Sequence, residues 1–140
     1  MFIGQYSNKI DDKGRLAIPT KFRTDLESGA VVTKGLDGCL FVYTAPEWQK
    51  LAERLTTLPL TTASARAFNR LMLAGAMEVY LDKQGRIILP AYLREFASIG
   101  TKVIVAGIYN RIEIWNEEAW LSYQQQSESA GAEAAEQLLF

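Results

Sequence analysis

The stretch Ile10-Asp11-Asp12-Lys13-Gly14-Arg15-Leu16-Ala17-Ile18-Pro19 occurs again in related form as Leu81-Asp82-Lys83-Gln84-Gly85-Arg86-Ile87-Ile88-Leu89-Pro90. The two copies lie 71 positions apart, with Asp, Gly, Arg and Pro in register and apolar residues between the arginine and the proline. A fixed internal period of this kind indicates a duplicated structural unit. The chain is therefore interpreted as two half-chains of about 70 residues.

The match extends beyond the two motifs. Phe22-Arg23 aligns with Leu93-Arg94, and with one residue of slippage Trp48 aligns with Trp120. A folded unit of this size buries only roughly 60% of the surface of its unfolded chain and is marginally stable alone. We therefore expect the two halves to pack into one pseudo-symmetric body.

The local pattern predicts tight turns, short strands and short helices. In Asp-x-x-Gly the aspartate accepts hydrogen bonds from nearby backbone and the glycine adopts a positive φ. A short strand buried on both faces should follow each turn, then Pro19 or Pro90 in a first helical turn, and a helix that Gly29 or Gly100 ends. We expect an α+β, mainly β fold, with two pseudo-symmetric βαββ-type repeats forming one small barrel with peripheral helices. The expected parts are a first repeat (1–58), a connecting helix (59–74), a second repeat (75–123) and a weakly ordered acidic tail (124–140).

Composition excludes several classes of protein. With 49% apolar and 22% charged residues, the chain is expected to form a packed core. No apolar run approaches the roughly 18 residues of a membrane span. The N-terminal segment lacks the basic and apolar regions of a secretion signal. These features predict a cytoplasmic protein without a membrane partner.

The chain has no histidine and one cysteine, Cys39. The absence of histidine removes the usual general base, the Ser-His and Cys-His pairs, and the commonest zinc ligand. Cys39 lies in an apolar run and is expected to be a small buried hydrophobe. The paired acids Glu117 and Glu118 are sequence neighbours, whose side chains do not converge on a helix. We expect no enzyme activity, cofactor, metal site or small-molecule substrate.

Charge is distributed unevenly along the chain. Residues 1–70 carry ten Lys or Arg against seven Asp or Glu, whereas residues 71–140 carry five against nine. The net charge of −1 alone argues against a nucleic-acid binder. The N-terminal excess of cations nevertheless predicts a basic surface near the first motif, where it would attract phosphate.

The doubled Asp-x-x-x-Arg, the doubled Gly-Arg followed by three apolar residues and Pro, and Trp48 and Trp120 together resemble the MraZ family of AbrB-like swapped-hairpin proteins. The resemblance extends from Met1 to about Tyr123. It implies small β-barrels that assemble into rings and bind promoter direct repeats in double-stranded DNA. It further implies a nucleoid-associated homo-oligomer that represses its own division and cell-wall operon.

The same resemblance associates the Asp-x-x-x-Arg motifs with DNA contact. The residues expected to contact DNA are Arg15, Lys13, Lys9, Arg86 and Lys83. A carboxylate is repelled by phosphate, so the residues expected to shape and orient the turns are Asp11, Asp82, Gly14 and Gly85. The second motif departs from the first, because Gln84 replaces Lys13 and Tyr80 replaces Lys9.

Other interpretations remain open for these residues. Arg15 and Asp11 could form a salt bridge that merely locks the turn, and any single lysine could belong to an ordinary solvated surface. The tryptophans could stack on bases, although their repeat-symmetric positions favour a core or a subunit interface. An oligomeric structural or protein-interaction scaffold without DNA selectivity is the alternative function, and the acidic net charge favours it.

Overall fold

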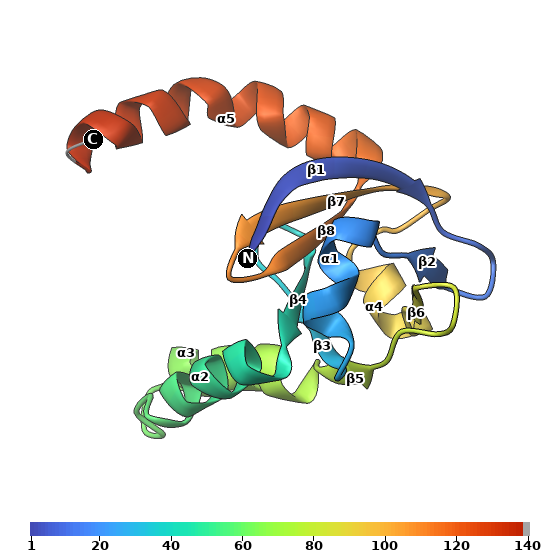
Figure 1. Ribbon diagram of the computed structural model, residues 1–140. Helices are drawn as coiled ribbons and strands as arrows, with labels where there is room; N and C mark the ends of the chain where they lie inside the picture. The colour runs from blue at the N-terminus through green and yellow to red at the C-terminus, as the bar shows by residue number, and fades with distance from the viewer. Residues whose placement is uncertain (139–140) are drawn as a thin grey trace.

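The computed structural model describes residues 1–138 and shows two interleaved copies of one unit (Figure 1). The first half comprises β1 (Phe2–Lys9), β2 (Arg15–Ala17), α1 (Thr20–Arg23) with a 3-10 turn (Thr24–Leu26), β3 (Ala30–Lys34), β4 (Leu40–Thr44) and α2 (Ala45–Thr56). The connecting segment comprises α3 (Ala63–Asn69) and a π-helical turn (Arg70–Ala74). The second half comprises β5 (Met77–Val79), β6 (Arg86–Ile88), α4 (Ala91–Phe96), β7 (Lys102–Tyr109), β8 (Ile112–Asn116) and α5 (Glu117–Gln137).

Six strands form one antiparallel sheet in the order β1-β7-β8-β4-β3-β5. In this sheet β1 pairs with β7 of the other half, β5 pairs with β3 of the other half, and β4 meets β8 between them. The remaining strands, β2 and β6, pair with each other as a separate two-stranded ribbon. Each half therefore lends strands to the other, and neither half can complete its pairing alone.

The pairing register preserves the repeat. In the ribbon Leu16 lies opposite Ile87, and in the sheet Phe41 lies opposite Glu113. These pairs are 71 and 72 positions apart, which are the offsets of the repeat in these parts of the chain. An approximate two-fold axis therefore passes through both pairs. The predicted α+β, mainly β fold with two repeats is confirmed.

The predicted barrel is not confirmed. The strand order has two ends, β1 and β5, and within residues 1–138 no backbone pairing joins them. After β1 and β5 the chain turns at Asp-x-x-Gly, and the segments that follow pair with each other as the ribbon. The structure is an open six-stranded sheet with a two-stranded ribbon, because the ribbon takes the place of a pairing between the sheet ends.

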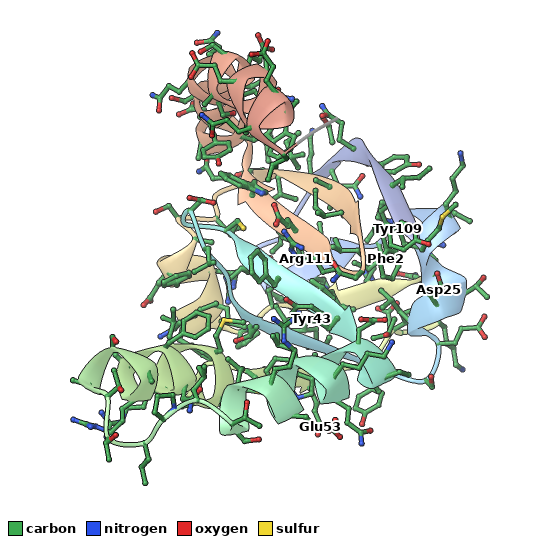
Figure 2. The ribbon with its side chains drawn as sticks, turned by 90° about the vertical axis from the view of Figure 1, so that its left-hand side faces the viewer. Phe2, Asp25, Tyr43, Glu53, Tyr109 and Arg111 are labelled. Carbon is green, nitrogen blue, oxygen red and sulfur yellow. The ribbon has the colours of Figure 1, made fainter. Side chains whose placement is uncertain are left out.

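The sheet buries side chains on both faces. On β4, Leu40 and Val42 belong to the core that contains the inner residues of the ribbon, whereas Phe41 and Tyr43 belong to a second core on the opposite face. This division follows the alternation of side chains along a strand. The second core includes residues of α2 and of the connecting segment. Figure 2 labels Tyr43 of this core and Arg111, whose guanidinium carbon lies 4.8 Å from the centre of the Phe41 ring.

The aromatic residues that mark the repeat lie in this second core. Trp115 is buried, and Trp48 and Trp120 pack against the cluster from α2 and α5. The ring centroids of Trp115 and Trp120 are 5.4 Å apart in an edge-on arrangement. Of the two expected locations, a core or a subunit interface, the structure places the tryptophans at the core.

Two local expectations are wrong. The strand after the second turn is not buried on both faces, since Ile88 is 59% exposed. The ribbon has the core on one side only, so alternate residues face outward. The helix α4 does not end at Gly100, because Ser98 adopts the positive φ of 51° after its last turn.

Residues 124–137 of the acidic C-terminal segment, for which we expected weak order, are helical, and residues 139–140 lie outside the described residues. Helix α5 continues to Gln137 and extends away from the body of the molecule (Figure 1). Asn116 caps it by accepting a hydrogen bond from the backbone N–H of Ala119 at 3.0 Å, and Glu117 and Glu118 occupy the first turn, where negative charge is favourable. No helix within the described residues combines the length and the apolar character that crossing a membrane requires.

Substitution of the neighbouring residues Ile87 and Ile88 tests whether the inner side of the ribbon is part of the core. Ile87 is 1% exposed and Ile88 is 59% exposed. We expect Ile87→Ala to lower the free energy of unfolding by about 2–5 kcal/mol, and Ile88→Ala to change it by less than about 0.5 kcal/mol. Urea unfolding followed by tryptophan fluorescence measures both values. Equal losses would show that the ribbon does not close the core as described.

Candidate nucleic-acid interface

The turn before β2, turn 1 (Asp11–Arg15), is held by one carboxylate. Asp11 Oδ1 accepts hydrogen bonds from the backbone N–H groups of Lys13 at 3.0 Å and Arg15 at 2.8 Å. Its Oδ2 accepts from Arg15 Nε at 2.5 Å. Gly14, at a φ of 84°, donates its N–H to the Asp11 carbonyl at 3.0 Å. The carboxylate therefore fixes both the turn backbone and the direction of the guanidinium.

Turn 2 (Asp82–Arg86) repeats this arrangement before β6. Asp82 Oδ1 accepts from the backbone N–H groups of Gln84 at 2.8 Å and Arg86 at 2.9 Å, and Oδ2 accepts from Arg86 Nε at 2.8 Å. Gly85 has a φ of 75°. The side chains of both arginines are about one-third exposed, at 34% for Arg15 and 29% for Arg86, so both reach solvent beside their aspartates.

The ribbon brings the two arginines onto one outer face. Leu16 and Ile87 point into the core at its centre, so the residues on either side of them point outward. Arg15 lies opposite Ile88, which is two positions from Arg86 on the same strand. Residues related diagonally in this way have Cα atoms roughly 7–8 Å apart. Two oriented guanidinium groups therefore flank the approximate two-fold axis.

Two lysines lie on the turns beside this face, and two more lie at the end of the β1–β7 pairing. Lys13 and Lys83 are exposed on turns 1 and 2. Lys9 ends β1 directly opposite Lys102 of β7, and both are exposed. Like charges directly opposite each other destabilise strand pairing, so an anion bound here would be stabilised. Glu117 lies with Lys9 and Lys102 in the lining of one surface hollow, and its carboxylate offsets part of the positive charge of the two lysines.

Lys102 was missed by the sequence analysis. It lies more than ninety positions from Lys9, and it meets Lys9 only through the β1–β7 pairing. No local signal could have indicated this neighbour, because the cross-half pairing joins segments from opposite ends of the chain. The cluster near turn 1 is therefore more cationic than its sequence alone suggested.

The hydrogen bonds of the turns also set the charge state of the aspartates. The backbone N–H of Arg15 is the main cause that lowers the pKa of Asp11 below its ordinary value of 3.8, and the Arg15 side chain and the Lys13 N–H add to it. The N–H of Arg86 is likewise the main cause that lowers the pKa of Asp82. Both aspartates are therefore ionised at neutral pH and pair with charged guanidinium groups.

Other titratable groups lie in the protein interior. Cys39 is fully buried, as expected, and burial raises the pKa of its thiol, which donates to the Leu36 carbonyl at 3.2 Å. The buried Glu113 accepts from Trp115 Nε1 at 3.1 Å and pairs with Arg111 at 2.9 Å. Within residues 1–138 no group of three or more His, Cys, Asp or Glu side chains is arranged to hold a metal ion. These interior groups stabilise the second core.

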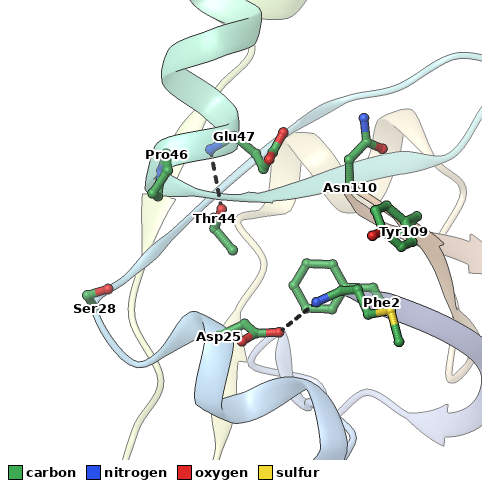
Figure 3. Close-up of a pocket in the computed structure, with 9 residues that line it drawn as sticks. Phe2, Asp25, Ser28, Thr44, Pro46, Glu47, Tyr109 and Asn110 are labelled. Carbon is green, nitrogen blue, oxygen red and sulfur yellow. Dashed lines mark hydrogen bonds and ion pairs between the residues drawn. The ribbon is translucent and has the colours of Figure 1, made fainter.

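A hollow of about 360 Å³ lies beside the N-terminus (Figure 3). Several of its polar groups have partners in the chain. The Met1 ammonium pairs with Asp25 Oδ2 at 3.3 Å, and the Thr44 hydroxyl accepts from the Glu47 N–H at 3.3 Å to cap α2. These groups stabilise the chain terminus and the start of a helix, and we assign no ligand to them.

The sequence signature of the family described as "MraZ protein, putative antitoxin-like" matches the chain twice, over residues 1–71 and 72–140. The two matches cover both halves of the fold. The chain belongs to the MraZ family.

Relatives of full length support the same family. A protein of Natranaerobius thermophilus named "Transcriptional regulator MraZ" is 48% identical over 139 residues, which cover 99% of this chain and 97% of the relative. A protein of the same name from Caldanaerobacter subterraneus subsp. tengcongensis is 51% identical over 138 residues, which cover 99% and 96%. The expected resemblance to MraZ is therefore confirmed, and the paired turns are a feature of an MraZ protein.

The aspartate of turn 1 should make the stability of this MraZ protein pH-dependent. Its folded-state pKa is lowered, so its contribution is fully present above the ordinary value of 3.8 and is lost as the pH falls through the lowered pKa. We expect Asp11→Asn to be less stable than the wild type at pH 7, and the difference to close well below pH 3.8. Urea unfolding at a series of pH values measures this. A difference that stays constant with pH would contradict the pairing.

Two glycines with similar φ separate backbone strain from close packing. Gly14 and Gly38 have φ values of 84° and 79°. A Cβ added at Gly14 would lie 2.5 Å from the Leu89 carbonyl oxygen, whereas at Gly38 nothing lies within 4 Å. We expect Gly38→Ala to cost about 1–2 kcal/mol of unfolding free energy and Gly14→Ala to cost at least about 1 kcal/mol more. Equal losses in urea unfolding would mean that Leu89 moves aside freely.

Proposed function

We propose that this MraZ protein is a sequence-specific double-stranded DNA-binding transcriptional regulator whose contact surface is the outer face of the β2–β6 ribbon. The observation that carries the proposal is the placement of Arg15 and Arg86 on that one face, each oriented by its own aspartate. The lysines of the turns extend the cationic surface. Both relatives described above are named transcriptional regulators, which supports this class of function.

A two-stranded β-ribbon has the dimensions to enter the major groove of B-DNA. Asp11 binds Nε of Arg15, and within residues 1–138 no other group accepts a hydrogen bond from that guanidinium. Its terminal nitrogens are then donors for a phosphate or for O6 and N7 of a guanine. The salt bridge to Asp11 and DNA contact are therefore compatible roles of the same arginine. The carboxylate aims the guanidinium, and the guanidinium bonds the DNA.

The two turns should contribute unequally. Turn 1 has Lys13 on it and Lys9 with Lys102 beside it, and Asp12 and Glu117 offset part of this charge, whereas turn 2 has Lys83 alone among the corresponding positions. Each phosphate contact adds to affinity and to its salt dependence. We propose that turn 1 supplies more of the phosphate contacts and that turn 2 adds Arg86.

One such face gives few contacts, so a single protomer should bind weakly. Several copies held together would bind repeated sites with higher avidity. We propose a homo-oligomer, following the ring assembly that the family resemblance implies, which binds direct repeats in its own promoter and represses the division and cell-wall operon. Such a regulator would work at the nucleoid, as a binding protein and not as an enzyme.

The test compares Arg15→Ala with Arg54→Ala, which removes the same charge from the exposed surface of α2. The probe is duplex DNA from upstream of the protein's own gene, with a scrambled-repeat duplex beside it, in anisotropy titrations at several salt concentrations. We expect Arg15→Ala to weaken binding to the repeat duplex roughly ten- to hundredfold. Arg54→Ala should change it less than about threefold, because it removes no contact at the ribbon.

Two results would contradict the proposal. Equal effects of Arg15→Ala and Arg54→Ala on affinity would show that the ribbon face is an ordinary charged surface. Failure of the wild type to bind any duplex at low salt would favour the alternative function, an oligomeric scaffold that interacts with protein partners.

A further inference from the structure

Two arginines outside the turns lie against them. Arg23 ends α1 and Arg94 lies in α4, at equivalent positions of the two repeats. Arg23 Nε donates to the Ile18 carbonyl at 2.8 Å, and Arg94 Nε donates to the Leu89 carbonyl at 3.0 Å. Both arginines are half-buried. Each guanidinium is therefore anchored to the strand end of its own half.

The same guanidinium groups contact the turns of the opposite halves. A Cβ added at Gly14 of turn 1 would lie 3.1 Å from Nε and 3.3 Å from Cζ of Arg94. A Cβ added at Gly85 of turn 2 would lie 2.5 Å from Cζ of Arg23. Because glycine has no side chain, each guanidinium packs directly on the backbone of a turn that belongs to the other repeat.

Backbone hydrogen bonds complete each contact. The Leu89 N–H donates to the Gly14 carbonyl at 2.8 Å, and the Ile18 N–H donates to the Gly85 carbonyl at 2.9 Å. Leu89 therefore binds turn 1 with its N–H and Arg94 with its carbonyl. Arg94, Leu89 and Gly14 form one closed set of contacts, in which Arg94 limits the movement of turn 1.

We propose that Arg94 and Arg23 are positioning residues for DNA binding that act across the repeats. Arg94 holds turn 1 and thereby aims Arg15, and Arg23 holds turn 2 and thereby aims Arg86. The inference rests on the proposed function of the ribbon face. Each turn then depends on an arginine of the other repeat.

The competing role for these arginines is direct contact with phosphate. A direct contact would contribute whether or not Arg15 is present, so its loss would add to the loss of Arg15. A residue that acts by aiming Arg15 has little left to contribute once Arg15 is gone. Double-mutant cycles measure this difference, since residues that act through each other are not additive.

The experiment measures DNA affinity for Arg94→Ala and Arg23→Ala, each alone and combined with Arg15→Ala or Arg86→Ala, at a salt concentration where all variants bind measurably. We expect Arg94→Ala to weaken binding about tenfold in the wild-type background and less than about twofold in the Arg15→Ala background. In the Arg86→Ala background, the loss of affinity caused by Arg94→Ala should add to the loss caused by Arg86→Ala. Arg23→Ala should show the mirror pattern, coupled to Arg86 and independent of Arg15.

The substitution Arg94→Lys distinguishes the positioning role of Arg94 from the effect of its positive charge. Lysine keeps the positive charge and the aliphatic stem, so the protein stays folded, but it lacks the planar group that both reaches the Leu89 carbonyl and covers Gly14. We expect Arg94→Lys to bind DNA nearly as weakly as Arg94→Ala. Full affinity in Arg94→Lys would overturn the positioning role.

Hydrogen–deuterium exchange in the absence of DNA tests whether Arg94 and Arg23 hold the turns, whether or not the protein binds DNA. The N–H groups of Gly14 and Arg15 are hydrogen-bonded within turn 1. Hydrogen–deuterium exchange of turn 1 should accelerate in Arg94→Lys while turn 2 is unchanged, and Arg23→Lys should do the reverse. Unchanged exchange, or additive effects in every cycle, would overturn the inference although the wild type binds DNA. Failure of the wild type to bind any duplex would overturn the proposed function itself.

Discussion

The antiparallel pairing of β2 with β6, one strand from each repeat, is the constraint on which the rest of the molecule depends. It places Leu16 against Ile87 over the core, and it joins each strand end to the glycine of the opposite turn through the Leu89 and Ile18 N–H groups. A ribbon of three residues per strand is far too short to be stable alone. Its stability comes from the buried side of the ribbon, and burial of that side forces the arginines onto the outer side.

The aspartate in each turn is an unexpected residue on a surface that we propose to contact phosphate. Its geometry resolves the conflict, because the Asp11 carboxylate is already occupied by two backbone N–H groups and by Nε of Arg15. These bonds lower the pKa of Asp11 and keep the carboxylate ionised, so that it orients the guanidinium at neutral pH. An arginine held at one nitrogen also loses less conformational entropy when the others bond a ligand.

The sequence predicted those parts of the fold that short segments determine. Asp-x-x-Gly predicted the turns with positive φ at Gly14 and Gly85, and the 71-residue period predicted a pseudo-symmetric pair of units. It did not predict the open sheet, or the approach of Lys102 to Lys9, because both result from pairing between strands of different halves. The continuation of the C-terminal helix through residues 124–137 was missed because the acidic composition of this segment predicted weak order.

The differences between the repeats carry more information about function than the similarities do. Asp, Gly and Arg recur in both turns because each turn needs the same carboxylate bonds and the same close approach of the opposite half. Their repetition is explained by folding alone. The lysines are not required by that geometry, and three of the four lie at or beside turn 1, where Lys9 faces Lys102 as a like-charge pair. Glu117 beside these lysines offsets part of their charge, and the exposed Asp12 of turn 1 stands where turn 2 has Lys83. The repeats therefore share their arginines and differ in their lysines, and the proposed inequality of the two turns in DNA binding rests on lysines that folding does not require.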